Sequence, residues 1–265
     1  MKNLILLLIT LLITTPSFSQ VYKKVKVYDE DYRLIDFEKE ADYSKYESIY
    51  LDTARYAFAP ISYIPNEVIL LRNLKSVSFT ITNDSAVKTV FDVLQEISTL
   101  ESLSIEGSNF NLGSVFEPSK SNSLSQFPIV VNGLINLKTL TLSGHYFNEI
   151  LIDTNKLNRL ESLYLFRNKL TEFPKLLLEL PRLVDLGLEN NYIKEIPTAF
   201  CNSKIIQLSI GRNRLSEIPE CIFEIDSFKM ILLNGNMIPK ELADKYLKLI
   251  EQTKSNVKLY LPISK

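Results

Sequence analysis

The feature that most constrains this chain is a recurring apolar triplet of the form L-x-x-L-x-L. Its three clearest copies start at Leu160, Leu183 and Ile205, so the pattern returns every 22 or 23 residues. This fixed period predicts a solenoid of stacked coils, because one unit cannot bury its own leucines and its neighbours must cover them. With the degenerate copies included, the units start at Tyr46, Leu74, Leu100, Leu137, Leu160, Leu183, Ile205 and Phe228.

The clear copies continue in the same way after the triplet. The last two apolar residues alternate with polar ones, which is typical of a short strand with one buried face. An asparagine follows, whose buried side chain can bond the backbone groups that a turn exposes. Pro174, Pro197 and Pro219 then begin the return path, where a fixed φ is useful. We therefore expect a structural asparagine ladder made of Asn168, Asn191, Asn213 and Asn236.

The repeat resembles the leucine-rich repeat family in its form L-x-x-L-x-L-x-x-N-x-L-x-x-L-P. The match is clear from Leu137 to Ile238 and degenerate upstream, and His145 replaces the ladder asparagine in its unit. The resemblance implies an α/β solenoid, a right-handed horseshoe with a parallel β-sheet on the concave face. It implies short helices or irregular return segments on the convex face. It also implies a module that binds a protein partner, although fold alone does not fix function.

Residues 1–19 have the organisation of a secretory signal peptide. Lys2 precedes an apolar run over residues 4–13, and Ser17 and Ser19 stand at the −3 and −1 positions before Gln20. The alternative is a membrane anchor, but a spanning helix needs about 20 apolar residues. We therefore expect an exported protein, periplasmic or secreted, with no stable membrane insertion.

The flanks of the array have the patterns of caps. Residues 20–45 form the expected N-terminal cap, in which residues 21–28 alternate like an edge strand. The array itself covers residues 46–238. Residues 239–253 predict an amphipathic helix and residues 257–261 a final strand, so residues 239–265 form the expected C-terminal helix and strand cap.

Two units are enlarged on the return side. Residues 85–98 predict a helix with Ser85 as its N-cap. Residues 111–126 form an insertion rich in serine and asparagine, which is either functional or merely tolerated, because lengthening a loop costs little.

The sequence offers little catalytic or metal-binding chemistry. The single histidine, His145, stands at a ladder position, where we expect a structural role. Asp29, Asp31 and Glu40 imitate three positions of a calcium loop, but the obligatory glycine is missing, and we interpret this run as a solvated face. We expect no enzyme, no cofactor and no metal. A net charge of −1 gives no general attraction to nucleic acid.

The two cysteines occupy neighbouring coils at different repeat positions. Cys201 lies four residues after Pro197, and Cys221 lies two residues after Pro219. We therefore expect the two side chains to point in different directions. Each cysteine should then serve as a small buried apolar residue. A disulfide is the alternative that export would permit. Animal extracellular members of the family that this chain resembles often close their ends with cysteine clusters. The absence of such clusters from this sequence favours a bacterial origin or simple helix and strand caps.

The variable positions of the strands should point outward on the concave face. Their N-terminal half is mostly small and hydroxylic, whereas one unit of the C-terminal half carries two aromatic residues and an arginine. Such a group matches the composition of binding hot spots, although single exposed aromatics are common. We expect partner binding at Tyr164, Phe166, Arg167, Glu189, Asn190 and Arg212.

Two functions fit this surface. One is a non-enzymatic protein–protein interaction module that uses the concave face. The alternative is a glycan- or peptide-binding surface protein, in which Tyr164, Phe166 and Arg167 contact the ligand.

Overall fold

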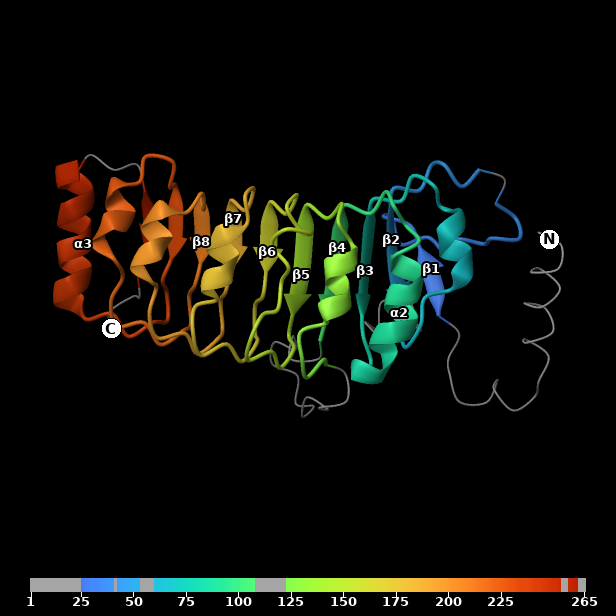
Figure 1. Ribbon diagram of the computed structural model, residues 1–265, viewed down its shortest axis with the longest axis horizontal. Coiled ribbons are helices and arrows are strands. Elements are labelled where there is room, and N and C mark those ends of the chain that lie inside the picture. The colour runs from blue at the N-terminus through green and yellow to red at the C-terminus, as the bar shows by residue number, and fades with distance from the viewer. Residues whose placement is uncertain (1–24, 41, 53–59, 108–122, 254–256, 262–265) are drawn as a thin grey trace.

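The computed structural model describes residues 25–40, 42–52, 60–107, 123–253 and 257–261. Within these residues the main element is a ten-stranded sheet whose strands follow chain order (Figure 1). β1 pairs antiparallel with β2, and each later neighbouring pair is parallel. The strands are β1 Lys26–Tyr28, β2 Ser48–Asp52, β3 Ser76–Thr80, β4 Ser102–Glu106, β5 Thr139–Ser143, β6 Ser162–Tyr164, β7 Asp185–Gly187, β8 Gln207–Ser209, β9 Met230–Leu232 and β10 Lys258–Tyr260.

The strands from β2 to β9 each begin two residues after one of the eight unit starts that the sequence pattern marks. Their second residues lie opposite one another from strand to strand and are buried, so they form one row of the core. Each such side chain contributes about 1.5–3 kcal/mol when fully buried. The row consists of Ile49, Val77, Leu103, Leu140, Leu163, Leu186, Leu208 and Ile231.

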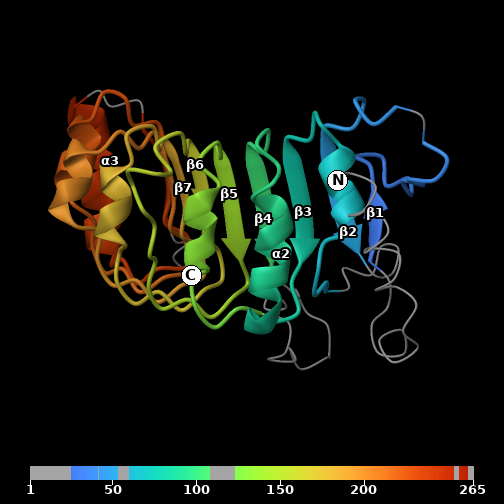
Figure 2. The same ribbon diagram turned by 45° about the vertical axis from the view of Figure 1, so that its right-hand side comes forward.

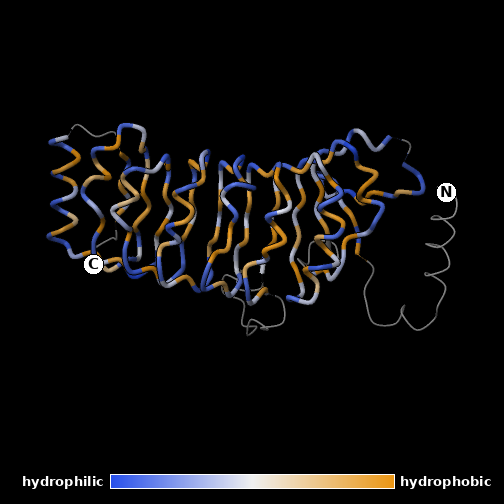
Figure 3. Tube along the Cα trace, in the orientation of Figure 1, coloured by the Kyte–Doolittle hydropathy of each residue, from blue (hydrophilic) through white to orange (hydrophobic). Residues whose placement is uncertain are grey.

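The return segments lie on the opposite side of the core from the sheet (Figure 2). Most of them hold a short 3-10 helix that begins directly after a proline, whose fixed φ suits the entry to a helix. These helices are η1 Asn66–Leu70, η4 Ile129–Gly133, η5 Lys175–Glu179, η6 Thr198–Asn202 and η7 Glu220–Glu224. Apolar segments recur in successive coils along the array (Figure 3).

The helix predicted over residues 85–98 is shorter, and its predicted cap is wrong. It begins as the 3-10 turn η2 Asp84–Ala86 and continues as α2 Val87–Leu94. The cap is Asn83, whose side-chain oxygen accepts a hydrogen bond from the backbone N–H of Ser85 at 3.0 Å. The cap lies two residues earlier because the extra 3-10 turn places Ser85 inside the first turn.

The C-terminal end of the array is covered by α3 Lys240–Thr253. Tyr246 is buried, and its hydroxyl both accepts from the backbone N–H of Ile218 at 2.9 Å and donates to the carbonyl of the same residue at 3.1 Å. Lys245 forms an ion pair with Glu220 of η7. β10 then adds a parallel strand beside β9, so both the core and the sheet edge are covered at this end.

Cys201 and Cys221 form a disulfide, so the expectation of two unpaired, buried cysteines is wrong. Their Cα atoms lie 5.9 Å apart, within bridging range, and both residues are only half-buried. The expectation failed because it compared positions within one repeat. Cys201 lies in η6 and Cys221 in η7, and these return helices pack side by side, so residues at different repeat positions meet across two coils.

The described chain therefore has the predicted α/β leucine-rich-repeat architecture, with a parallel sheet on one face and short helices on the other. The predicted signal peptide and most of the predicted insertion lie outside the described residues. Within the described part of the chain, each helix is too short or too polar to cross a bilayer.

Candidate functional site

The C-terminal strands end in a turn that passes through one residue with a left-handed backbone. Its φ is +55° at Arg167, +56° at Asn190 and +52° at Arg212, and glycines take the same position at Gly144 and Gly235. Residues other than glycine adopt this region infrequently. Three of the predicted binding residues therefore belong to the turn at the edge of the sheet and not to the strands.

The ladder asparagines hold this turn in place. The side-chain nitrogen of Asn191 donates to the carbonyls of Leu165 and Leu188, both at 3.0 Å, and its oxygen accepts from the N–H of Leu170 at 3.1 Å. Asn168, Asn213 and Asn236 make the corresponding bonds. Each asparagine thus ties its own coil to the preceding one.

His145 replaces one rung of this ladder. It is fully buried, its Nδ1 accepts from the N–H of Leu124 at 3.2 Å, and its Nε2 lies 3.1 Å from the carbonyl of Ile105. The carbonyl requires a donor, so the hydrogen is on Nε2. Burial lowers the pKa of His145 to about 4. The structural role predicted for this histidine is therefore confirmed.

Tyr164 and Phe166 form an aromatic plate with Gly187 on the concave face. The two rings are stacked, with centroids 5.4 Å apart and planes inclined by 30°. The Tyr164 hydroxyl donates to a carboxylate oxygen of Asp185 at 2.6 Å. Both rings extend over Gly187, where a Cβ would lie only 2.3 Å from Cε1 of Phe166. Both aromatic residues remain half-exposed, so the plate is accessible and already ordered.

The remaining predicted residues surround this plate at different distances along the array. Glu189 lies beside it, and its carbonyl accepts from the N–H of Arg167 at 2.9 Å. Asn190 bonds in turn to Gly211 of the next coil, at 3.0 Å. Arg212 is exposed two coils beyond Arg167, and its Cγ lies against Gly235. The structure therefore brings Tyr164 and Phe166 into contact and spreads the polar residues along the edge.

A row of alternating aromatic and basic side chains follows the ladder, and the sequence analysis did not single it out. Lys169 Nζ lies 5.8 Å from the ring centroid of Tyr146 and 5.2 Å from that of Tyr192. The guanidinium of Arg214 lies 4.6 Å from the Tyr192 ring centroid. These are cation–π distances. These four side chains contact one another and so connect neighbouring coils.

The N-terminal cap folds back over the opposite end of the concave face. The turn after β1 is closed by backbone bonds between Asp29 and Arg33 and between Tyr32 and Asp29, at 2.9 and 3.0 Å. The Asp29 carboxylate accepts the N–H groups of Asp31 and Arg33. Tyr32 has a left-handed φ of +58°, and its ring meets Tyr50 of β2 edge-on at 5.8 Å. This contact places the loop above the sheet.

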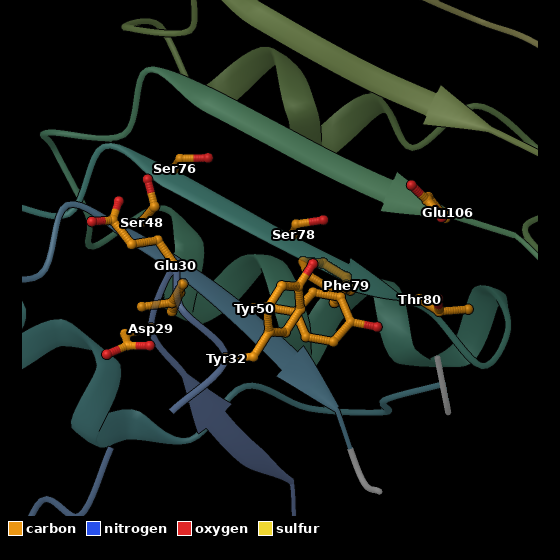
Figure 4. A pocket seen from close by; sticks show the side chains of 11 residues that line it. Asp29, Glu30, Tyr32, Ser48, Tyr50, Ser76, Ser78, Phe79, Thr80 and Glu106 are labelled. Carbon is orange, nitrogen blue, oxygen red and sulfur yellow. The ribbon is translucent and has the colours of Figure 1, made fainter. Parts of the chain in front are cut away.

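The loop and strands β2 to β4 enclose a pocket of about 240 Å³, here called the N-terminal pocket (Figure 4). Its described lining includes carboxylates, hydroxyls and the two tyrosines, and none of these residues is a lysine, arginine or histidine. Half-buried Glu106 closes it on β4, and burial raises the pKa of this carboxyl. The lining residues are Asp29, Glu30, Tyr32, Ser48, Ile49, Tyr50, Ser76, Ser78, Phe79, Thr80 and Glu106.

Sequence reasoning missed this pocket because it treated the acidic run at Asp29 as a solvated face. The available signals were Tyr50 and Glu106, which interrupt an otherwise small and hydroxylic surface. Among the described residues, no group of three or more histidine, cysteine, aspartate or glutamate side chains is placed to hold a metal ion.

No protein-family model matches the chain. Osteomodulin from Bos taurus is 32% identical over 144 residues, which cover 50% of this chain and 33% of osteomodulin. Osteomodulin from Rattus norvegicus is 28% identical over 213 residues, which cover 72% of this chain and 49% of the relative. The chain therefore spans between a third and a half of the length of these relatives.

An internalin C2 from Listeria monocytogenes has a similar solved structure. The TM-score is 0.55, the sequence identity is 19%, and the match covers 87% of this chain and 85% of the internalin. This likeness concerns the fold alone. Osteomodulin is itself a leucine-rich-repeat protein. The chain thus has a leucine-rich-repeat solenoid fold.

Proposed function

We propose that the protein is an exported, non-enzymatic module that binds a protein partner through the concave face of its repeat array. The observation that carries this proposal is the aromatic plate. Tyr164 and Phe166 present half-exposed rings in the middle of the array, between the outward polar residues Thr141 of β5 and Ser209 of β8. Aromatic anchors of this kind, with arginines nearby, are typical of the residues that dominate binding energy.

The plate is suited to binding because its side chains are ordered before a ligand arrives. The stacking of the rings, the bond from Tyr164 to Asp185 and the close approach to Gly187 restrict the rotamers of both aromatics. Immobilising a flexible side chain costs about 0.5–1.5 kcal/mol on association, and a preordered plate avoids much of this cost. Arg167, Glu189, Asn190 and Arg212 are proposed as the polar rim.

Export is supported by two features of the chain. Residues 1–19 have a signal-peptide pattern, and Cys201 is bonded to Cys221. Disulfides persist in oxidising compartments and are rare in the cytosol. A periplasmic or secreted location and a bacterial origin are the finer parts of this proposal.

The experiment compares the protein with a variant that carries Tyr164→Ala and Phe166→Ala. Partners captured by the unaltered protein are identified, and the affinity of each is measured by surface plasmon resonance. We expect the double variant to bind at least about 100-fold more weakly, because two central aromatic anchors are removed. The matched control is Tyr146→Ala with Tyr192→Ala, which removes two aromatics outside the plate and should leave affinity unchanged. Equal affinity of the plate variant and the unaltered protein would refute the proposal.

A glycan or peptide ligand is the second candidate. It is favoured by the combination of a flat aromatic surface with the polar Tyr164–Asp185 pair at its margin, since stacked rings and hydrogen-bonding groups together suit a sugar ring. A glycan array and a peptide library, each probed with the unaltered protein and the plate variant, distinguish this candidate from a folded protein partner.

A further inference from the structure

The N-terminal pocket is a second concave feature, separate from the aromatic plate in sequence and in place. It is formed by two segments, the cap loop at Asp29 to Arg33 and the outward side chains of β2 to β4. The loop is fixed by its backbone bonds, by a bridge between Tyr28 and Leu34, and by the ring contact of Tyr32 with Tyr50. These contacts fix the loop, so the wall of the pocket that it forms is in place before a ligand binds.

The charged side chains that line the pocket are acidic. Asp29, Glu30 and Glu106 line it, and none of the described lining residues is basic. Two acids directly before strands of this sheet are paired with lysines of the next coil: Glu47 bonds Lys75 and Glu101 bonds Lys138, each at 2.9 Å. Among the described residues, the Glu106 side chain has no such partner, although it is half-buried. A partly desolvated carboxylate without a counter-charge is costly, and a cation from outside would compensate it.

A second observation at the same place concerns Ser143. This residue lies opposite Glu106 in the register of β4 and β5, and its buried Oγ has no hydrogen-bond partner within the described structure. Buried hydroxyls are normally bonded, so an unpaired one requires an explanation. The hydroxyl can donate to the neighbouring carboxylate once that carboxylate is held in place by a bound cation. Two adjacent polar side chains are thus both unpaired beside one pocket.

The two tyrosines and the pocket volume restrict the kind of cation. In Figure 4 the rings of Tyr32 and Tyr50 lie between the carboxylates of the cap loop and Glu106. Aromatic faces attract ammonium and guanidinium groups within about 6 Å of the ring centroid. A volume of about 240 Å³ is below the roughly 300–1,000 Å³ of pockets for drug-sized ligands, so it suits one side chain.

We propose that the N-terminal pocket binds the ammonium or guanidinium group of a lysine or arginine side chain on a peptide ligand. Glu106 supplies the counter-charge, the tyrosines contact the aliphatic stem and the cation, and the hydroxyls of Ser78 and Thr80 form the floor. A metal ion is the less suitable occupant, because no three carboxylates of the described chain are grouped to coordinate one. The aromatic plate plays no part in this site.

The test uses Nα-acetyl-lysine amide as probe and Nα-acetyl-norleucine amide as its uncharged counterpart, with binding measured by NMR titration of the full protein. We expect millimolar binding of the lysine probe with shifts at β2 to β4, and no saturable binding of the norleucine probe. Glu106→Gln should weaken lysine binding at least tenfold while keeping the side-chain volume. Tyr32→Gly should also weaken it, because glycine tolerates the left-handed backbone but removes the ring.

The controls separate this proposal from the preceding one. Glu101→Gln removes an acid that is already paired with Lys138 and should leave lysine binding unchanged. The plate variant, Tyr164→Ala with Phe166→Ala, should bind the lysine probe as the unaltered protein does. Equal binding of the norleucine probe, unchanged binding by Glu106→Gln, or displacement of the lysine probe by micromolar Ca²⁺ would overturn the proposal. Each of these outcomes leaves the proposed role of the plate intact.

Discussion

The two halves of this solenoid share one sheet but create their surfaces by different means. Strands β2 to β5 contain five residues each, whereas β6 to β9 contain three and end in a left-handed turn supported by an asparagine ladder. In the C-terminal half the surface comes from the repeat itself, as in the plate at Tyr164 and Phe166. In the N-terminal half it comes from a cap loop that folds over the strands. The surface of the regular C-terminal repeats can therefore be predicted from the sequence, whereas the irregular N-terminal end forms an enclosed pocket.

The largest expected effect comes from breaking the ladder that distinguishes the C-terminal half. Asn191→Ala leaves the N–H of Leu170 and the carbonyls of Leu165 and Leu188 without their side-chain partner. At about 1–3 kcal/mol for each buried group that becomes unpaired, we expect the free energy of unfolding to fall by about 4 kcal/mol, measured by urea denaturation.

Asn136→Ala provides the matched comparison. Its side chain lies outside the ladder and donates to the carbonyl of Ser98 near the surface. We expect a loss below about 1 kcal/mol for this change. Equal losses for the two variants would mean that the ladder does not set the stability of the C-terminal half.

The next effect concerns the boundary between the halves, where His145 takes a ladder position. Burial lowers the pKa of His145 from 6.5 to about 4, and the hydrogen bond to the Ile105 carbonyl and the nearby Asp84 carboxylate oppose this shift only in part. As the pH falls below 6.5, the unfolded chain therefore takes up a proton before the folded chain does. The stabilisation is complete above pH 6.5 and is lost progressively as the pH approaches 4. We expect a loss of about 3 kcal/mol over this window.

The variant His145→Asn isolates this term, because asparagine supplies a ladder side chain that does not titrate. Urea denaturation of both proteins between pH 7 and 4 gives the difference in their free energies of unfolding. That difference should change by about 3 kcal/mol in favour of the variant as the pH falls. A difference that stays constant with pH would show that His145 does not titrate as its burial requires.

The smallest expected effect tests whether Gly187 is needed for the position of the plate. Gly187→Ala places a Cβ 2.3 Å from the Phe166 ring and 2.8 Å from that of Tyr164. Because these atoms belong to rotatable rings, we expect a modest loss of about 1 kcal/mol together with a displaced plate. Near-ultraviolet circular dichroism should change, and the partner should bind more weakly. Ser209→Ala, in the same column on the next strand, should alter neither property.

The features that follow the repeat were predictable from sequence, because the residues that specify them lie within a single unit. Leu163, Leu186 and Leu208 mark both the period and the buried row, and the asparagine positions mark the turn. The pairing of Cys201 with Cys221 was not predictable in this way, because it depends on the lateral offset between two coils. The cap of α2 required the extra turn at Asp84 to be foreseen.

The candidate site likewise has one part that the sequence could predict and one part that it could not. Contact between Tyr164, the last residue of β6, and Phe166, two residues beyond it, follows from the period-two alternation of side chains, so the sequence could identify the plate. The N-terminal pocket joins Tyr32 of the cap to Glu106 of β4, two residues far apart in the chain. Their proximity depends on the backward fold of one loop, which no repeat pattern encodes.

The disulfide also limits how far the array can unfold from its C-terminal end. In a solenoid each coil contacts only its neighbours, so partial opening starts at an end and proceeds coil by coil. Opening from the C-terminal end can release β10, α3 and then the coil of η7, but Cys221 remains attached to Cys201 in the preceding coil. Such fraying is stopped by a covalent bond after one coil. The plate lies on the protected side of that stop, so a loss of order at the C-terminus leaves its geometry undisturbed.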